Sequence, residues 1–76
     1  MDLARLHWAA KRRGILELDI LFERYLQDRY PSASSVEQKT FEALLSLQDQ
    51  TLFDWLVKRE PVDQPEFVEM VAMLLG

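Results

Sequence analysis

Apolar residues recur with helical spacing along the whole chain, and no segment alternates apolar and polar positions in the way a strand does. Glycines and prolines punctuate this pattern at Gly14, Pro31, Pro61, Pro65 and Gly76. We therefore predict an all-α protein, a compact five-helix bundle of short helices. The chain is expected to be a single domain, residues 1–76, with a radius of gyration of roughly 11 Å.

The first two predicted helices meet at Gly14. The first has its apolar side at Leu3, Leu6, His7 and Ala10. The second, from Ile15 to Tyr30, has a wide apolar stripe made by Ile15, Leu18, Leu21, Phe22, Tyr25 and Leu26, with Glu17, Arg24 and Asp28 opposite. Leu16 and Ile20 lie outside that stripe and are neighbours on the helix surface, so they form a second apolar spot.

Pro31–Ser35 is predicted to be a loop before a third helix, which runs to about Leu47. Either Ser34 with Glu37 or Ser35 with Gln38 can form a capping box at its start. The inward positions of this helix are predicted to be Val36, Phe41, Leu44, Leu45 and Leu47.

Two shorter helices complete the prediction. Asp49 is the expected N-cap of the fourth, which ends before Pro61 with Lys58 and Arg59 at its C-terminal end and carries Leu52, Phe53, Trp55 and Leu56. Trp55 is assigned to the core, because it shares a helical face with Leu52 and Leu56. Asp63 and Glu66 are expected to cap the fifth helix, with Pro65 in its first turn and an inward face of Phe67, Met70, Val71 and Leu74.

The composition indicates a folded domain and fits a reducing compartment. Apolar residues make up 49% of the chain and charged residues 29%, which is the balance of a folded domain rather than a disordered tail. Without cysteine the chain has no disulfide or thiolate, which fits a reducing compartment. The longest apolar run, Met70–Leu75, is too short to span a bilayer. We expect a cytoplasmic protein that does not insert into membranes.

The distribution of charge argues against nucleic acid as a partner. Residues 1–30 carry six basic and five acidic groups, residues 31–76 carry three and eight, and the net charge is −4. The cations gather at Lys11, Arg12 and Arg13, which is too small a footprint to replace the counterions of a duplex.

The residues that enzymes need are also missing from the sequence. It has one histidine and no cysteine, no glycine-rich phosphate loop, and no histidine and carboxylate set with the spacing of metal ligands. His7 lies on an apolar helix face and is interpreted as structural, and the carboxylates of Glu17 and Asp19 are interpreted as solvated. We predict no catalytic activity, no metal site and no tightly bound cofactor, flavin included.

The segment from Arg12 to Asp19 admits two interpretations. In one, Gly14 permits a tight corner between helices and Glu17 bonds back to its amide as a capping box, which explains both residues structurally. In the other, the bare corner lets a partner backbone approach, and Arg13 and Glu17 offer it charge-assisted hydrogen bonds. The apolar spot of Leu16 and Ile20 lies next to this corner. Protein interfaces have the same composition, an apolar core bordered by polar groups. Trp8 is either an exposed interface anchor or buried by the first helix.

Arg13, Gly14 and Glu17 form an R-G-x-x-E signature, which is followed in order by Phe41, Leu44 and Leu45, Asp49, Leu52, and Trp55 and Leu56. In this the chain resembles the small assembly factors that promote covalent flavinylation of succinate dehydrogenase. The resemblance covers nearly the whole chain, and the family fold is a compact five-helix bundle.

The resemblance implies that the chain binds the flavoprotein subunit of succinate dehydrogenase, fumarate reductase or both. It implies that binding favours the conformation in which that subunit's own histidine attacks the flavin ring, so that the factor shifts a population rather than supplying a catalytic group. Arg13, Gly14 and Glu17 take the partner-contact role, with Arg12, Asp19, Leu16, Ile20 and Trp8 beside them. We expect the free chain to be a monomer. The alternative is a regulatory module of antitoxin-like type that uses the same surface for a different protein.

Overall fold

The computed structural model describes residues 15–76, so the first predicted helix lies outside the described part of the chain. The elements from residue 15 onward are α2 (Leu16–Asp28), the 3-10 segment η1 (Tyr30–Ser32), α3 (Ser35–Leu45), α4 (Asp49–Leu56), the 3-10 segment η2 (Pro65–Phe67) and α5 (Val68–Leu75). The all-α class is confirmed for this part. Four α-helices are described in residues 15–76, and the first of the five predicted helices falls outside this range.

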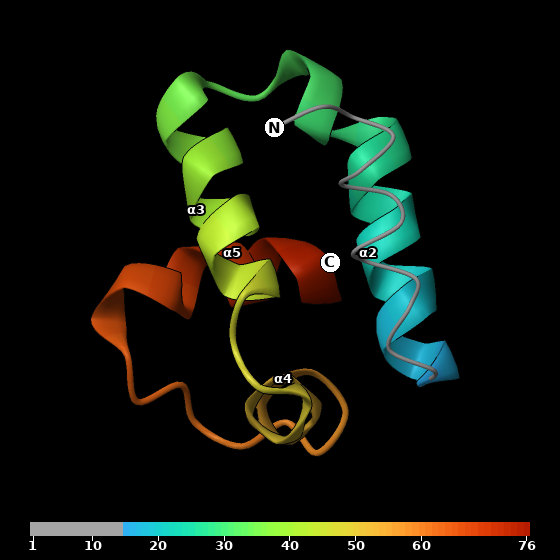
Figure 1. Ribbon diagram of the computed structural model, residues 1–76, viewed down its shortest axis with the longest axis vertical. Coiled ribbons are helices and arrows are strands. Elements are labelled where there is room, and N and C mark those ends of the chain that lie inside the picture. The colour runs from blue at the N-terminus through green and yellow to red at the C-terminus, as the bar shows by residue number, and fades with distance from the viewer. Residues whose placement is uncertain (1–14) are drawn as a thin grey trace.

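Helix α5 is the centre of the arrangement. It contacts α2, α3 and α4, while η1 joins α2 to α3 across one end of the molecule (Figure 1). This position explains the composition of α5, in which Glu69 is the only charged residue. The radius of gyration is 11.3 Å, in agreement with the value expected from chain length.

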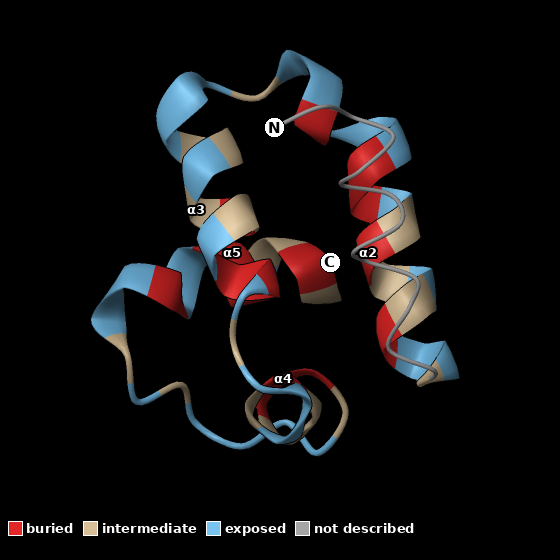
Figure 2. Cartoon of the chain, viewed as in Figure 1, coloured by how far each residue is buried: buried red, intermediate tan, exposed pale blue. Residues whose placement is uncertain are grey.

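The buried side chains lie on the inner faces of all four helices (Figure 2). At one end Phe41 forms an aromatic cluster, with ring centroids 6.0 Å from Phe22, 4.5 Å from Tyr25 and 6.0 Å from Tyr30. At the other end Trp55 packs on Phe67 at 6.0 Å, which confirms the assignment of Trp55 to the core. The predicted stripes are buried in α2 at Leu18, Phe22, Tyr25 and Leu26, and on the last helix at Phe67, Met70, Val71 and Leu74.

The start of α3 confirms one of the two caps left open. The amide of Glu37 donates to Ser34 Oγ at 3.1 Å, so Ser34 is the N-cap. The reciprocal half of the capping box is absent, because the Glu37 carboxylate is engaged by α2 instead. The helix ends at Leu45, two residues before the predicted end. The preceding segment is not wholly loop, since Tyr30–Ser32 forms a 3-10 turn with Pro31 at its start.

Two predicted caps are wrong. Gln48, in an extended conformation, is the N-cap of α4, and Asp49 is the first helical residue, where its charge still faces the positive end of the helix. No side chain caps η2 or α5, because Pro65 opens a 3-10 turn that continues into α5 and leaves no place for a cap from Asp63.

Val36 is also wrongly predicted, as an inward residue of α3. Its side chain is 74% exposed, whereas Phe41, Leu44 and Leu45 are buried. At about 100° per residue, Val36 stands about 140° around the helix from Phe41, beyond the edge of the buried face.

Candidate functional site

The predicted site residues divide between the first turns of α2 and the segment before it. Leu16, Glu17, Asp19 and Ile20 belong to the described part of the chain. Trp8, Arg12, Arg13 and Gly14 lie outside it.

The N-terminus of α2 bears on the capping interpretation of Glu17. Ile15 is the N-cap, with extended backbone (φ −110°, ψ 106°) and no side-chain capping bond. The carbonyl of Ile15 accepts the amide of Asp19 at 3.0 Å. Glu17 is therefore the second helical residue, whereas the glutamate of a capping box is the third. The exposed Glu17 side chain stays close to the helix N-terminus, where a negative charge is favourable.

The apolar pair next to Glu17 faces solvent as predicted. The side chain of Leu16 is 68% exposed and that of Ile20 is 55% exposed, while Leu18 between them is fully buried. The solvent-facing surface at the start of α2 is visible in Figure 2. We call Leu16, Glu17, Asp19 and Ile20 the α2 start surface.

Asp19 stands at the edge of this surface with one oxygen that is not satisfied. Its Oδ1 is buried and has no hydrogen-bond partner in the described part of the chain. A shallow hollow of about 390 Å³ opens beside it, lined by Asp19, Ile20, Glu23, Arg24 and Gln27. Buried carboxylate oxygens without a partner are uncommon in folded proteins.

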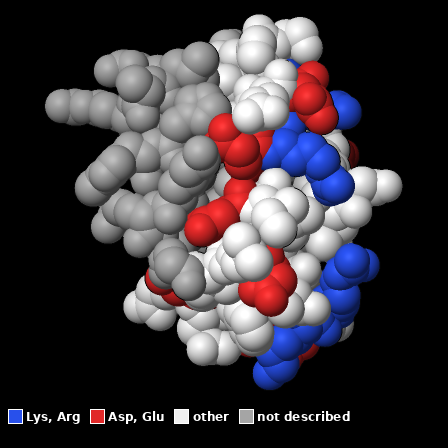
Figure 3. All heavy atoms as spheres, turned by 90° about the vertical axis from the view of Figure 1, so that its right-hand side faces the viewer, with Lys and Arg blue, Asp and Glu red and all other residues white. Residues whose placement is uncertain are grey.

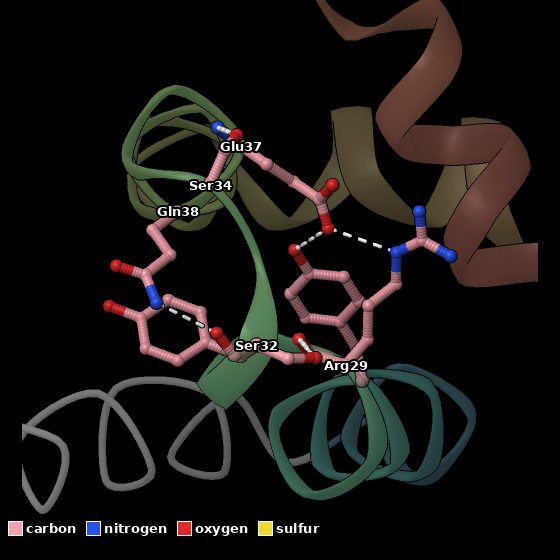
Figure 4. Close-up of polar contacts among 7 residues, drawn as sticks. Arg29, Ser32, Ser34, Glu37 and Gln38 are labelled. Atoms are coloured by element: carbon pink, nitrogen blue, oxygen red, sulfur yellow. Dashed lines mark hydrogen bonds and ion pairs between the residues drawn. The ribbon is translucent and has the colours of Figure 1, made fainter.

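The other end of α2 is tied to α3 by polar side chains (Figure 4). Glu37 Oε2 accepts the hydroxyl of Tyr25 at 2.7 Å and Arg29 Nε at 3.0 Å. The hydrogen bond from Tyr25, followed by that from Arg29, holds the pKa of Glu37 below its ordinary value. Burial, followed by the hydrogen bond to Glu37, raises the pKa of Tyr25. This network was missed from the sequence, because nothing in the spacing of residues 25, 29 and 37 predicts that they meet.

Tyr30 adds two hydrogen bonds to α3 at the same end of the molecule. Its hydroxyl donates to Glu42 Oε2 at 2.8 Å, and Gln38 Nε2 donates to its carbonyl at 2.7 Å. A hollow of about 520 Å³ lies beside the network and is lined by residues of α2, α3, α5 and the connecting loop, among them Arg24, Asp28 and Arg29. There, Arg24 Nη2 donates a hydrogen bond to the carbonyl of Leu74 at 3.0 Å. Because hydrogen bonds hold the C-terminal part of α2 to α3 and α5, we call it the consolidated end.

Neither a metal centre nor a membrane segment is found in the described residues. No group of three or more histidine, cysteine, aspartate or glutamate side chains in residues 15–76 is placed to hold a metal ion. None of the helices over the same range has the length and apolarity needed to cross a bilayer.

Comparison with known proteins identifies the family. Residues 4–76 match the family model described as flavinator of succinate dehydrogenase. The chain belongs to this family. The match covers the R-G-x-x-E signature and every helix of the described part.

Three relatives, each named FAD assembly factor SdhE, show how complete the similarity is. The protein from Colwellia psychrerythraea is 44% identical over 75 residues, which cover 99% of this chain and 81% of that protein. The protein from Pseudomonas putida is 38% identical over 74 residues, covering 97% and 87%. The protein from Shewanella oneidensis is 38% identical over 76 residues, covering 100% and 92%. No solved structure gave a match.

Family membership also settles the class of activity. The members are assembly factors rather than enzymes, so the site to be explained is a surface that contacts another protein. The α2 start surface is the described surface that adjoins the family signature, and Glu17 belongs to both.

Proposed function

We propose that this chain acts as an FAD assembly factor by docking the α2 start surface, together with Arg12, Arg13, Gly14 and Trp8, onto the flavoprotein subunit of succinate dehydrogenase. The proposed activity rests on family membership. The proposed place of contact is supported by the exposure of Leu16 and Ile20 beside Glu17. A small apolar centre with charged groups around it is the usual composition of a protein interface.

The chemistry of the exposed groups suits a partner that offers hydrogen-bond donors. Neither Glu17 nor Asp19 makes an ion pair or side-chain hydrogen bond within residues 15–76, and Oδ1 of Asp19 is already shielded from water. Donors from the client would satisfy these carboxylates when Leu16 and Ile20 become buried. Charge-assisted bonds of this kind are shorter and stronger than neutral ones, so they fix the orientation of the docked proteins.

Docking acts on the conformation of the client. The flavoprotein subunit alternates between states that do and do not place its own histidine against the flavin ring, and the factor binds the reactive state more tightly. A ligand shifts such an equilibrium only by its differential affinity, so a few kcal/mol of selective contact gives on the order of a hundredfold change in population. The chain supplies no reacting atom in this scheme.

The remaining features of the proposal concern partners and place. The clients are succinate dehydrogenase, fumarate reductase or both, and the factor works as a cytoplasmic monomer without nucleic acid. Among the described residues seen on the α2 side of the molecule, basic groups are interspersed with acidic and uncharged ones (Figure 3). This pattern supports a protein partner over a polyanion.

The decisive test measures covalent flavin on the client. The flavoprotein subunit is produced with and without this chain, separated in a denaturing gel, and its flavin fluorescence is compared. Gly14→Arg adds a long side chain at the corner, and Glu17→Gln removes the carboxylate charge. Both variants are expected to lose most of the covalent flavin.

Asp28→Asn is the matched control for Glu17→Gln, because Asp28 is an exposed carboxylate on the same helix that makes no ion pair or hydrogen bond within residues 15–76. It should leave flavinylation unchanged. Full activity of Gly14→Arg and Glu17→Gln would contradict docking through this surface. Unchanged covalent flavin in the absence of the chain would contradict the proposed activity itself.

A further inference from the structure

A second unpartnered surface lies between α3 and the start of α5, away from the α2 start surface. Two adjoining hollows of about 330 and 290 Å³ share Val36, Thr40 and Glu66 in their lining. Between them they also include Ala43, Phe67, Met70 and Met73. We call this continuous depression the α3–α5 groove.

Val36 is the exposed large apolar residue among the described residues that line the groove. Val36 is 74% exposed, although a valine in the first turn of a helix gains nothing from facing water. Met73 is partly buried in the lining, while Met70 and Phe67 lie almost fully buried beneath it, and methionine side chains adapt their shape to the side chains that enter.

Acidic groups border this groove without being neutralised. Glu66 and Glu69 line the groove from the η2 and α5 side and make no ion pair or hydrogen bond within residues 15–76. Lys39 is the only cation among the described residues that line the groove, and Glu37, at the other end, is already paired with Arg29. The rim therefore carries an excess of unpaired negative charge, which favours positively charged partners.

From this complementarity we propose that the α3–α5 groove is a second docking surface, and that its occupant is a segment of a partner protein in which aliphatic side chains alternate with lysine or arginine. The aliphatic groups enter the two hollows beside Val36, and the cations pair with Glu66 and Glu69. This interaction is separate from docking through α2 and does not require it.

The test is an NMR titration of the full ¹⁵N-labelled chain with a defined probe, the blocked peptide acetyl-Lys-Leu-Lys-Leu-Lys-amide. Amide shifts should move at Val36, Thr40, Ala43, Glu66 and Glu69. The blocked peptides with glutamate for lysine and with serine for leucine test charge and apolarity separately, and neither should move those signals. In Glu66→Lys and in Val36→Ser the affinity for the probe should fall about threefold to fivefold, as partly exposed contacts allow.

Two matched variants complete the design. Asp28→Lys makes the same change in charge as Glu66→Lys outside the groove, and Val68→Ser removes a half-exposed valine that does not line it. Both should bind the probe within twofold of the original chain. The proposal is overturned if the glutamate peptide shifts the same residues equally, or if the lysine peptide shifts residues outside the groove instead. Concentration-dependent shifts of the groove residues without peptide would also overturn it, because the occupant would then be a second copy of the chain.

Discussion

The two ends of α2 differ in how their polar and apolar groups are used. At the C-terminal end, Tyr25 and Arg29 both bond to Glu37 of α3, and the aromatic ring of Tyr25 lies 4.5 Å from that of Phe41. At the N-terminal end, Leu16 and Ile20 face solvent, and Oδ1 of Asp19 has no partner in the described part of the chain.

The difference shows that the C-terminal end of α2 contributes to stability, and it supports our proposal that the N-terminal end serves recognition. Satisfied hydrogen bonds and buried rings lower the free energy of the fold, whereas exposed leucine and isoleucine contribute little to it. The N-terminal end therefore carries the features expected of a surface that is completed by another protein.

The largest expected effect comes from removing the ring that holds the consolidated end together. Phe41→Ala should lower the free energy of unfolding by about 3–5 kcal/mol, because a fully buried phenylalanine with three aromatic neighbours is replaced by a cavity. Urea denaturation followed by circular dichroism measures the loss. A loss below about 1 kcal/mol would mean that the aromatic cluster is not the centre of the fold.

The next effect should appear in binding and not in stability. Ile20→Asp places a charge in the middle of the α2 start surface and is expected to weaken binding to the flavoprotein subunit by about tenfold or more. Its free energy of unfolding should change by no more than about 0.5 kcal/mol, because the side chain is exposed. Isothermal titration calorimetry against the purified subunit and urea denaturation give the two values.

Val68→Asp is the control for Ile20→Asp, since Val68 is also about half exposed but lies at the start of α5. It should leave the affinity for the subunit unchanged. If both aspartate variants bind equally well, the contrast between the two ends of α2 has no functional meaning.

The sequence predicted the buried stripes of the helices well, and the reason is periodicity. The spacing of one helical face is seen at Leu18, Phe22, Tyr25 and Leu26, and all four side chains are buried in the structure. Leu16 and Ile20 were recognised as exposed by the same rule, since they fall outside the stripe. The family was recognised for a different reason, because the R-G-x-x-E signature and the order of downstream residues are specific in combination.

Helix ends and long-range polar contacts could not be predicted in the same way. The cap at Ser34 has a local signal, but Asp49 and Asp63 carry the same signal and are not caps. Backbone geometry set by Gln48 and Pro65 decides those ends. The bonds from Tyr25 and Arg29 to Glu37 depend on how α3 packs on α2, which no window of sequence contains. The positions of Trp8, Arg12, Arg13 and Gly14 stay predictions.

A smaller effect is expected when the tie between α2 and α3 is cut without making a cavity. Glu37→Gln keeps the shape of the side chain but removes the charge that Tyr25 and Arg29 bond to. The loss of free energy of unfolding should be about 1–2 kcal/mol. Covalent flavin on the client should stay unchanged, because the altered group lies at the consolidated end. A large loss of flavinylation in this stably folded variant would contradict the division of α2 into two functions.

Loss of the Ser34 cap should cost about 1 kcal/mol of stability, because Ser34→Ala leaves the amide of Glu37 without its side-chain acceptor. Ser35→Ala is the matched control, since Ser35 was the alternative cap and is not used. Chemical denaturation of the two variants side by side should show the effect only for Ser34→Ala. Equal losses would mean that the cap contributes nothing specific.

The smallest expected effect is a pH dependence of the free energy of unfolding, and it also arises at the C-terminal end of α2. The pKa of Glu37 in the folded chain lies below its ordinary value of 4.5, mainly because Tyr25 and Arg29 bond to the charged form. The folded state therefore binds this proton less readily than the unfolded state does. The contribution of Glu37 to stability is present above pH 4.5 and is lost as pH falls below that value. Urea denaturation between pH 3 and pH 7 should show the difference between the original chain and Glu37→Gln shrinking towards the acid end. A difference that stays constant across this range would mean that the charge of Glu37 does not hold the two helices together, and that the end of α2 is consolidated by its aromatic rings alone.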